Sequence, residues 1–241
     1  MGLSVEPIGV IHSCFKDKFG VPRQPGLASA ANAWLELFAP YNRTKAFSGL
    51  EGFSHIWITF VFHLCLDQGA RLSVRPPRLG GNCKVGVFAS RATHRPNPVG
   101  ISVAELVGIE QYEGGAHLRL RGIDLVDGTP VLDIKPYVPY SDSIPEARAD
   151  YAQQAPTASF AVVFSAEAEV QCEQYSQRWP ELGQLIVEVL ALDPRPAYLA
   201  GRSAEKPFAI RLYELDVYWR VMAESMIEVV SIVSGDKCIF D

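Results

Sequence analysis

Three polar side chains at alternate positions near the middle of the chain could perform acid/base chemistry. Asp133, Lys135 and Tyr137 lie in the segment DGTPVLDIKPY. If residues 131–137 form a strand, side chains alternate between its two faces, so these three share one face. A carboxylate, an ammonium and a phenol in one row can form an acid/base cluster. They can equally form an exposed ion pair worth about 0–1 kcal/mol, and the spacing alone leaves both interpretations open.

A second candidate is the segment RATHRPNPVG, which carries two guanidinium groups and an amide on Arg91, Arg95 and Asn97. Pro96 and Pro98 fix their own φ angles and favour extended geometry in the residues before them. A stiff loop holds its side chains at a low entropic cost, and the planar donor fork of arginine suits a carboxylate or a phosphate. The segment is therefore expected to grip an anion, and the alternative is a structural loop with solvated arginines.

Three further segments carry weaker signals. The turn VPRQPG places Arg23 and Gln24 in a rigid segment that could present backbone groups to a ligand. His63 follows an apolar run, and a single histidine at a strand end is more often structural than catalytic. The segment DPRPAY, which contains Arg195 and Tyr198, indicates on its own only a helix stop and a turn.

The charged residues are distributed unevenly, although the formal net charge is only −5. Residues 138–193 contain nine acidic and two basic residues, a local charge of −7. The contrast between this acidic region and the basic region at residues 68–104 is typical of a protein with one basic binding face, such as a face that contacts nucleic acid. The alternative is a set of arginines scattered over a solvated surface. Residues 68–104 contain no Asp or Glu and carry a local charge of +6, from Arg71, Arg75, Arg78, Lys84, Arg91 and Arg95.

The first 137 residues predict short strands separated by turns. Leu35 and Leu37 alternate with residues of the opposite face, and residues 56–62 form an apolar run that predicts a buried strand. Residues 131–137 predict another strand, with Leu132 and Ile134 in the core. Turn signals occur at EGG, DGTP and LGGN, and no segment here predicts a convincing helix. Many short strands with Gly and Pro turns favour an antiparallel barrel or sandwich.

The composition changes after this region. The polar, proline-containing stretch that follows predicts a linker, and what comes after it predicts a small α+β domain. The expected boundaries are residues 1–140 for the barrel, 141–157 for the linker and 158–241 for the second domain. Within the second domain the sequence predicts a strand at 159–164, a helix with one apolar face at 181–192, and a closing β-hairpin at 208–217 and 227–233.

Several common site types are missing from the sequence. There is no GxGxxG, GxxxxGK[ST], HExxH or GxSxG motif, which disfavours a Rossmann cofactor site and a zinc hydrolase. The five cysteines are scattered without a CxxC pair, which indicates neither a disulfide framework nor a metal site. No secretory signal pattern or membrane-length apolar run occurs, so a cytoplasmic location and no membrane partner are expected.

Seven segments together resemble the TrmO family, also called the YaeB or TsaA-like family, in the same order and over nearly the whole chain. Each segment alone is modestly specific, whereas the ordered set is highly specific. The segments are PIGVIHS, FGVPRQPGL, GLEGFSHIWITFVFH, VRPPRLGGN, GVFASRATHRPNPVG, DLVDGTPVLDIKPY and DPRPAY.

The resemblance implies an N-terminal antiparallel β-barrel, a small α+β C-terminal domain and a homodimer. It implies transfer of a methyl group from S-adenosylmethionine to N6 of N6-threonylcarbamoyladenosine, beside the anticodon of threonine tRNA. By motif, the implied cofactor contacts are Pro22, Arg23, Gln24, His63, Leu64, Arg91, Asp127, Gly128, Thr129 and Pro130. The expected RNA contacts are Arg71, Arg75, Arg78, Arg95, Asn97, Arg195 and Tyr198, of which the last two could face the partner subunit's site.

Within this reaction Asp133 is the candidate general base, because the acceptor nitrogen bears a proton that must leave. Lys135 could stabilise the ionised carboxylate or bind the threonyl carboxylate, and Arg91 or Arg95 is the alternative for the second role. His94 is a weaker candidate base.

Tyr137 could stack on an unstacked base of the anticodon loop. Two other functions remain open from the sequence. One is a non-catalytic regulator that binds S-adenosylmethionine and RNA without turnover. The other is a small-molecule methyltransferase whose arginines bind an acidic metabolite, which would be indifferent to tRNA.

Overall fold

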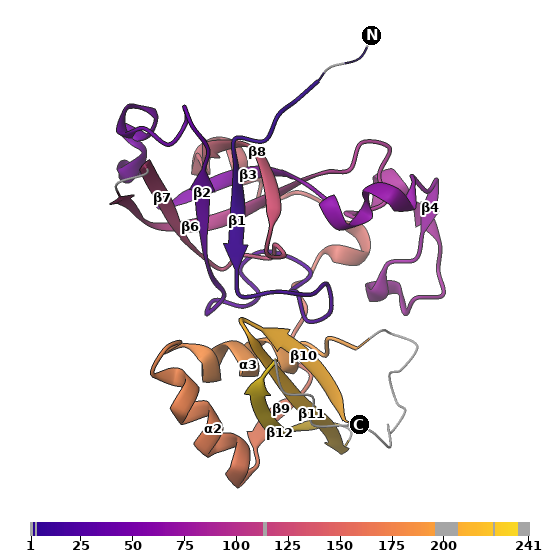
Figure 1. The fold of residues 1–241 in the computed structure, drawn as a ribbon. Helices are drawn as coiled ribbons and strands as arrows, with labels where there is room; N and C mark the ends of the chain where they lie inside the picture. The colour runs from indigo at the N-terminus through magenta and orange to yellow at the C-terminus, as the bar shows by residue number, and fades with distance from the viewer. Residues whose placement is uncertain (1, 3, 113–114, 196–206, 224, 236–241) are drawn as a thin grey trace.

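Six strands of the N-terminal half close into an antiparallel barrel, as the computed structural model shows (Figure 1). Their hydrogen-bonded order is β1-β2-β7-β6-β3-β8, and β8 pairs back with β1. The structure describes residues 2, 4–112, 115–195, 207–223 and 225–235. The strands are β1 (Gly9–Ser13), β2 (Asn32–Leu37), β3 (His55–Val61), β6 (Val99–Tyr112), β7 (Gly115–Arg121) and β8 (Thr129–Pro136). The predicted antiparallel barrel is confirmed.

The barrel interior follows the alternation of the sequence. Leu35 and Leu37 are buried and the intervening side chains of β2 point outward, as predicted. The apolar run of β3 also alternates: Ile56 and Ile58 are fully buried, whereas Trp57 on the outer face is half-buried. β3 is hydrogen-bonded along both edges, to β6 and to β8.

β8 departs from simple alternation. In the neighbouring strand β3, Phe60 pairs with Val131 and Thr59 pairs with Asp133. Leu132 of β8 is therefore skipped in the register. This bulge reverses the alternation. Val131 therefore faces the core, and Leu132 is only half-buried and outside the core cluster. The prediction that Leu132 lies in the core is wrong, whereas Ile134 does pack against it.

Between β3 and β6 the chain leaves the barrel and forms an excursion (residues 62–98), which projects to one side around β4 (Figure 1). It contains a 3-10 helix, η3 (His63–Gln68), and a two-stranded sheet of β4 (Ser73–Val74) and β5 (Val85–Gly86). Most of the acid-free basic stretch lies here, outside the packed barrel.

The C-terminal domain is a four-stranded sheet with two helices on it. Its strands are β9 (Ala161–Phe164), β10 (Phe208–Leu212), β11 (Leu215–Ala223) and β12 (Met226–Ser234), and its helices are α2 (Ala166–Ser176) and α3 (Leu182–Ala191). The sheet order is β10-β11-β12-β9, with β9 parallel to β12. The small α+β domain and the helix at α3 are therefore confirmed.

Two features of this domain were not predicted. Residues 208–217 form parts of two strands, because Tyr213 adopts a left-handed turn conformation with φ of 54°. α2 also escaped detection, because Ala168 is its only fully buried residue among the described ones and its sequence shows no continuous apolar face. Its start is fixed by Ser165, whose hydroxyl accepts a hydrogen bond from the N–H of Ala168 at 3.1 Å.

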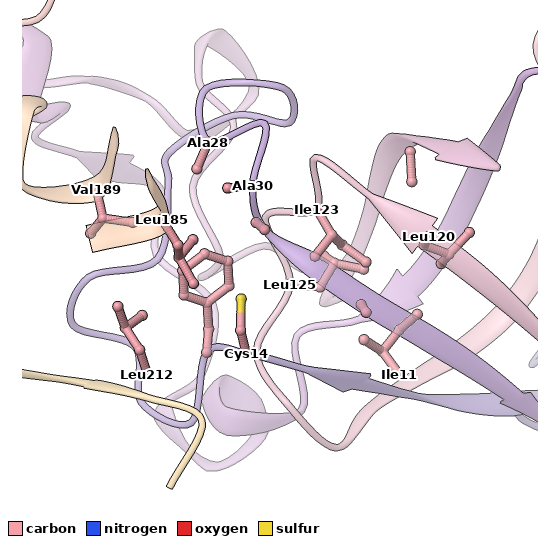
Figure 2. Packing of buried hydrophobic residues seen from close by; sticks show 14 of the residues in the cluster. Ile11, Cys14, Ala28, Ala30, Leu120, Ile123, Leu125, Leu185, Val189 and Leu212 are labelled. Carbon is pink, nitrogen blue, oxygen red and sulfur yellow. The ribbon is translucent and has the colours of Figure 1, made fainter. Parts of the chain in front are cut away.

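The two domains share one hydrophobic core. Figure 2 shows Leu185 and Val189 of α3 lying against Cys14 and Ala28 of the loops that flank β1 and β2. Polar contacts close the same interface: Glu188 accepts hydrogen bonds from the Ser29 hydroxyl at 2.6 Å and from the N–H of Ala30 at 2.9 Å. The C-terminal domain therefore braces the loop that carries the turn VPRQPG.

The predicted linker also makes specific contacts. It begins with a short helix, α1 (Pro139–Asp142), whose Asp142 accepts a hydrogen bond from Trp57 Nε1 at 2.8 Å. Farther along, the Tyr151 hydroxyl donates to the carbonyl of Ala89 at 3.0 Å. The linker thus runs beside β3 and the excursion. No helix in the described part of the chain is long and apolar enough to cross a membrane.

Candidate active site

The turn VPRQPG (residues 21–26) and the segment RATHRPNPVG (residues 91–100, the arginine loop) form one wall at the end of the barrel. Arg91 Nη1 donates a hydrogen bond to Gln24 Oε1, although the two residues are 67 positions apart. Gln24 Nε2 donates to the carbonyl oxygen of Arg23, which links the amide back to its own turn. Pro22 is buried beneath and anchors that turn. The structure therefore brings together four residues that the motifs imply as cofactor contacts.

η3 adjoins this wall through Cys65, whose thiol donates a hydrogen bond to the Thr93 hydroxyl at 3.3 Å. Lys18 Nζ donates a hydrogen bond to the carbonyl of Leu64 at 2.6 Å, and the Leu64 side chain is exposed. Partial burial lowers the pKa of His63, and the nearby Lys18 ammonium lowers it further. His63 is therefore a neutral imidazole at pH 7, which can donate or accept a hydrogen bond without adding positive charge.

The turn from Asp127 to Pro130 is held mainly by its own side chains. Asp127 accepts a hydrogen bond from the N–H of Ser13 at 2.9 Å and forms an ion pair with Lys16 at 2.9 Å. Thr129 is buried and donates to a backbone carbonyl of the same turn at 2.6 Å. Gly128 is exposed with φ of 76°, and a Cβ added there would meet no atom within 4 Å. The open space beside this turn thus lies at Gly128.

The predicted acid/base row lies on the outer face of β8. Asp133 accepts a hydrogen bond from the Lys135 ammonium, and both side chains are at least half exposed. Lys135 pairs with Trp57 across the sheet, and the Trp57 ring lies 5.8 Å from the ring of Tyr137. The three residues therefore share a face, and the indole ring of Trp57 lies on the same face.

Strand register connects this row to the barrel-end wall. Thr59 of β3 pairs with Asp133 on one side and with Ile101 of β6 on the other. β3 continues to Val61, and His63 follows it directly. Ile101 is 58% exposed, which is unusual for a residue in the middle of a sheet. The outer face of β3, β6 and β8 therefore leads from the acid/base row to His63.

The predicted RNA contacts separate into two groups. Arg71, Arg75 and Asn97 are exposed, and Arg78 is exposed while donating to the carbonyl of Gln154. Arg95 is half-buried, because its Nη1 donates to the carbonyls of Val87 and Ser90 at 3.3 and 2.8 Å. Arg95 therefore stabilises the loop that carries Arg91.

Arg195 has a structural position in the C-terminal domain. Its side chain is 4% exposed and forms a two-contact pair with Asp193 at 2.7 and 2.9 Å. It also packs over the ring of Phe160 at 5.5 Å. A buried, paired guanidinium does not support the prediction that Arg195 contacts RNA. Tyr198, predicted to act with it, lies outside the described residues.

His94, the weaker candidate base, is held by neighbours in the excursion. Its Nε2 shares a hydrogen bond of 2.8 Å with Gln68 Oε1. Partial burial lowers the pKa of His94, and the charges of Arg71 and Lys18 lower it further. The ring is therefore neutral at pH 7, and its Nδ1 also shares a hydrogen bond of 3.3 Å with the Thr93 hydroxyl, so both nitrogens are engaged.

Sequence reasoning missed two residues at this site. Ile101 has a detectable signal, because it alternates with Val99 and Val103 on the outer face of β6. Asp124 has almost no detectable signal in the sequence, although it begins the segment DLVDGTPVLDIKPY. It lies half-buried in the loop between β7 and β8, where its carboxylate accepts a hydrogen bond from the Ser102 hydroxyl.

Comparison with known proteins assigns the chain to a family. The model described as the tRNA-methyltransferase O N-terminal domain matches residues 10–143, and the TrmO C-terminal domain model matches residues 157–235. The chain belongs to the TrmO family. Among the described residues of this TrmO family member, no group of three or more His, Cys, Asp or Glu side chains could hold a metal ion.

Two TrmO relatives and one solved structure show how far the similarity extends. A protein of Escherichia coli (strain K12), named tRNA (adenine(37)-N6)-methyltransferase, is 54% identical over 216 residues, which are 90% of this chain and 92% of the relative. A protein of Pseudomonas aeruginosa, named putative S-adenosylmethionine-dependent methyltransferase RcsF, is 49% identical over 97% of this chain and 99% of its own length. The crystal structure of TrmO from P. aeruginosa superposes with a TM-score of 0.81 at 44% identity, covering 98% of both chains.

Proposed function

We propose that this protein transfers a methyl group from S-adenosylmethionine to N6 of adenosine 37 in tRNA, with N6-threonylcarbamoyladenosine of threonine tRNA as the acceptor. The observation that carries the proposal is the 54% identity to the E. coli tRNA (adenine(37)-N6)-methyltransferase over nine-tenths of the chain. The acceptor's threonylcarbamoyl group and the choice of threonine tRNA come from the family resemblance of the seven sequence segments.

The barrel end suits S-adenosylmethionine, which supplies an electrophilic methyl group on a sulfonium. Arg91 offers an exposed guanidinium that could bind the carboxylate of the donor, and Gln24 holds that guanidinium in place. His63 is neutral and so does not repel the sulfonium. A Cβ added at Gly26 or Gly128 would meet no atom within 4 Å, so both turns leave room for a ligand.

Methyl transfer to nitrogen requires alignment of the reacting atoms and removal of a proton. Positioning supplies much of the acceleration in such a displacement. Asp133 would accept the proton from the acceptor nitrogen, and Lys135 would stabilise the ionised carboxylate or bind the threonyl carboxylate. The half-buried rings of Trp57 and Tyr137 offer an aromatic surface for a base of the anticodon loop.

The direct test is transfer of labelled methyl from S-adenosylmethionine to purified threonine tRNA, with and without the threonylcarbamoyl group. Transfer to the modified tRNA alone is expected. Transfer to neither tRNA, with cofactor binding intact, would contradict the proposed reaction and favour a regulator that binds S-adenosylmethionine and RNA. Transfer to an acidic small molecule with indifference to tRNA would favour a small-molecule methyltransferase.

Arg91→Lys is expected to weaken S-adenosylmethionine binding by about 10- to 100-fold, because lysine lacks the planar donor fork and cannot contact Gln24 and a carboxylate together. Isothermal titration calorimetry measures the Kd. The matched control is Arg119→Lys, which changes an exposed arginine of β7 that pairs with Glu110. An unchanged Kd for Arg91→Lys would remove Arg91 from the cofactor site.

The double variant Arg71→Ala/Arg75→Ala is expected to weaken tRNA binding and to lower the slope of log K against log salt by about 1 to 2. Both side chains are exposed in the acid-free excursion and can reach phosphates. Filter binding across a series of salt concentrations measures the slope. Arg119→Ala serves as the control, and a slope shared by all three proteins would place the RNA elsewhere.

We also infer a homodimer, which rests on the family resemblance alone. Size-exclusion chromatography with light scattering tests it. A mass of twice the 26.5 kDa chain is expected, and a monomer at all concentrations used in the methyl-transfer assay would contradict the inference.

A further inference from the structure

A polar pocket of about 290 Å³ lies on the outer face of the barrel, beside the end of the turn VPRQPG. Glu105 of β6 and Arg121 of β7 line it, and the two residues are paired directly across these strands. His55 of β3 pairs with Glu105 on the other side and also lines the pocket. Pro25 and Gly26 of the turn form the facing wall. The reaction outlined above uses none of these five residues.

The two charged side chains of the pocket do not neutralise each other. Opposite charges at paired positions of neighbouring strands can form an ion pair, but no ion pair joins Glu105 and Arg121. Among the described residues, the half-buried Glu105 carboxylate has no hydrogen-bond or ion-pair partner. Arg121 approaches Glu181 of the C-terminal domain at 3.6 Å, yet its Nε is buried without a partner in the described part of the chain. An acceptor and a set of donors are therefore available to a ligand.

The balance of charge at the pocket disfavours an anionic ligand. The guanidinium of Arg121 is its one lining cation, and the carboxylates of Glu105 and Glu181 lie on either side of it. A phosphate or the threonyl carboxylate would gain little net attraction from this set of charges. A neutral ligand that offers hydrogen-bond donors to the carboxylate and acceptors to the guanidinium matches it better.

The pocket begins where the aromatic surface proposed for the anticodon loop ends. The His55 ring lies 6.4 Å from the ring of Tyr137, which also contacts Trp57. Asp133 pairs with Thr59, four residues farther along β3, so about 13 Å of strand separates the candidate base from the pocket. The threonylcarbamoyl group of a nucleotide held at Asp133 is too short to reach it. A neighbouring nucleotide of the same loop could do so.

Guanine is the base whose edges match this pocket. Its N1–H and N2 amine are adjacent donors for a carboxylate such as Glu105, and its O6 and N7 are adjacent acceptors for a guanidinium such as Arg121. Unstacked bases of RNA loops are read in this way on both edges and are held by stacking. Threonine codons begin with AC, so the middle base of the anticodon is guanine in every threonine tRNA.

We propose that this pocket binds the middle anticodon base of the tRNA and that Glu105 and Arg121 read it as guanine, which makes the enzyme specific for threonine tRNA. The inference rests on the proposed function, because it takes the anticodon loop of tRNA as the substrate. Glu105 accepts hydrogen bonds from N1 and N2 of the base, and Arg121 donates to O6 and N7. A tRNA with another middle base leaves at least one of these groups unpaired, which costs binding free energy.

The first test changes the RNA and leaves the protein intact. The kcat/KM of methyl transfer is measured on threonylcarbamoylated threonine tRNA with anticodon GGU, and on the same tRNA with inosine as the middle base. Inosine lacks only the N2 amine of guanine. The expected kcat/KM is about tenfold lower, because one hydrogen bond to the Glu105 carboxylate is lost. Inosine at the first anticodon position is the matched control and should leave kcat/KM unchanged.

The second test combines both partners in a double-mutant cycle. Glu105→Gln is expected to lower kcat/KM for the guanine tRNA by about tenfold and to make the enzyme indifferent to inosine at the middle position. Arg121→Lys should reduce the response to 7-deazaguanine, which lacks the N7 acceptor, because lysine lacks the planar donor fork. Glu110→Gln, at the exposed far end of β6, is the control variant. Thermal unfolding checks that each barrel is intact, and the Kd for S-adenosylmethionine should be unchanged in every variant.

The outcomes separate this inference from the proposed function. A wild-type enzyme that methylates the guanine and inosine tRNAs equally well would overturn the inference and leave the methyl-transfer reaction in place. Additive effects of Glu105→Gln and inosine, or a loss confined to inosine at the first position, would also overturn it. A weaker Kd for S-adenosylmethionine in Glu105→Gln would place Glu105 at the cofactor instead. No transfer to tRNA with an unaltered anticodon would overturn the proposed function, and this inference with it.

Discussion

Replacing Asp133 with asparagine is expected to lower the rate of methyl transfer by about 100- to 1,000-fold, because general bases contribute acceleration of that order. The carboxamide keeps the size of the side chain but cannot accept the proton of the acceptor nitrogen. The hydrogen bond that Asp133 accepts from the N–H of Ile134 at 3.0 Å can be retained by the amide oxygen. The strand and the barrel-end wall should therefore be unchanged, and so should the Kd for S-adenosylmethionine.

The measurement is a single-turnover assay with saturating donor and modified tRNA, combined with calorimetry for the donor alone. Asp67→Asn is the matched control, since Asp67 is an exposed carboxylate of η3 outside the acid/base row. A normal single-turnover rate for Asp133→Asn would exclude Asp133 as the base. His94 would then become the next candidate, although its Nε2 is engaged by Gln68.

Gly9→Ala is expected to destabilise the protein by about 3 kcal/mol, at the upper end of what overpacking costs. A Cβ on Gly9 would lie 2.3 Å from the backbone oxygen of Glu36 and 3.1 Å from the Cα of Leu37. Neither atom can rotate away, so β1 and β2 would have to separate where they close the barrel. For a chain of this size the loss corresponds to a melting temperature lower by about 6–12 °C.

Differential scanning calorimetry measures this shift. Gly108→Ala provides a control within the same barrel, because Gly108 lies on β6 and an added Cβ meets no atom within 4 Å. That variant should change the free energy of unfolding by less than about 0.5 kcal/mol. Equal stability of the two variants would show that β1 can shift without loss of packing.

The local pattern of apolar and polar side chains was sufficient to predict much of the fold. Alternation at Leu35 and Leu37 predicted the inward face of β2, and the apolar face of residues 181–192 predicted α3. These elements bury a side-chain pattern whose period matches their own geometry, so the pattern is visible without knowledge of the partners. α2 lacks such a pattern, since Ala168 is its one buried residue among those described, and it was missed.

The bulge in β8 shows where local pattern fails. Strict alternation placed Leu132 in the core, but pairing with β3 skips one residue between Val131 and Asp133. The position of a bulge depends on the register of the neighbouring strand, which the sequence of β8 does not contain. The burial of Arg195 could not be predicted for a similar reason, because its pairing with Asp193 and its packing against Phe160 depend on how the C-terminal domain packs.

The sequence by itself determined the family, the barrel and the residue types of the site, because ordered motifs and side-chain periodicity are properties of the chain alone. The tertiary structure decided which of those residues meet. Gln24 and Arg91 are 67 positions apart and come into contact only because the turn and the arginine loop converge at one end of the barrel. Asp124 and Ser102 meet in the same way, because the loop between β7 and β8 reaches strand β6 only in the folded barrel.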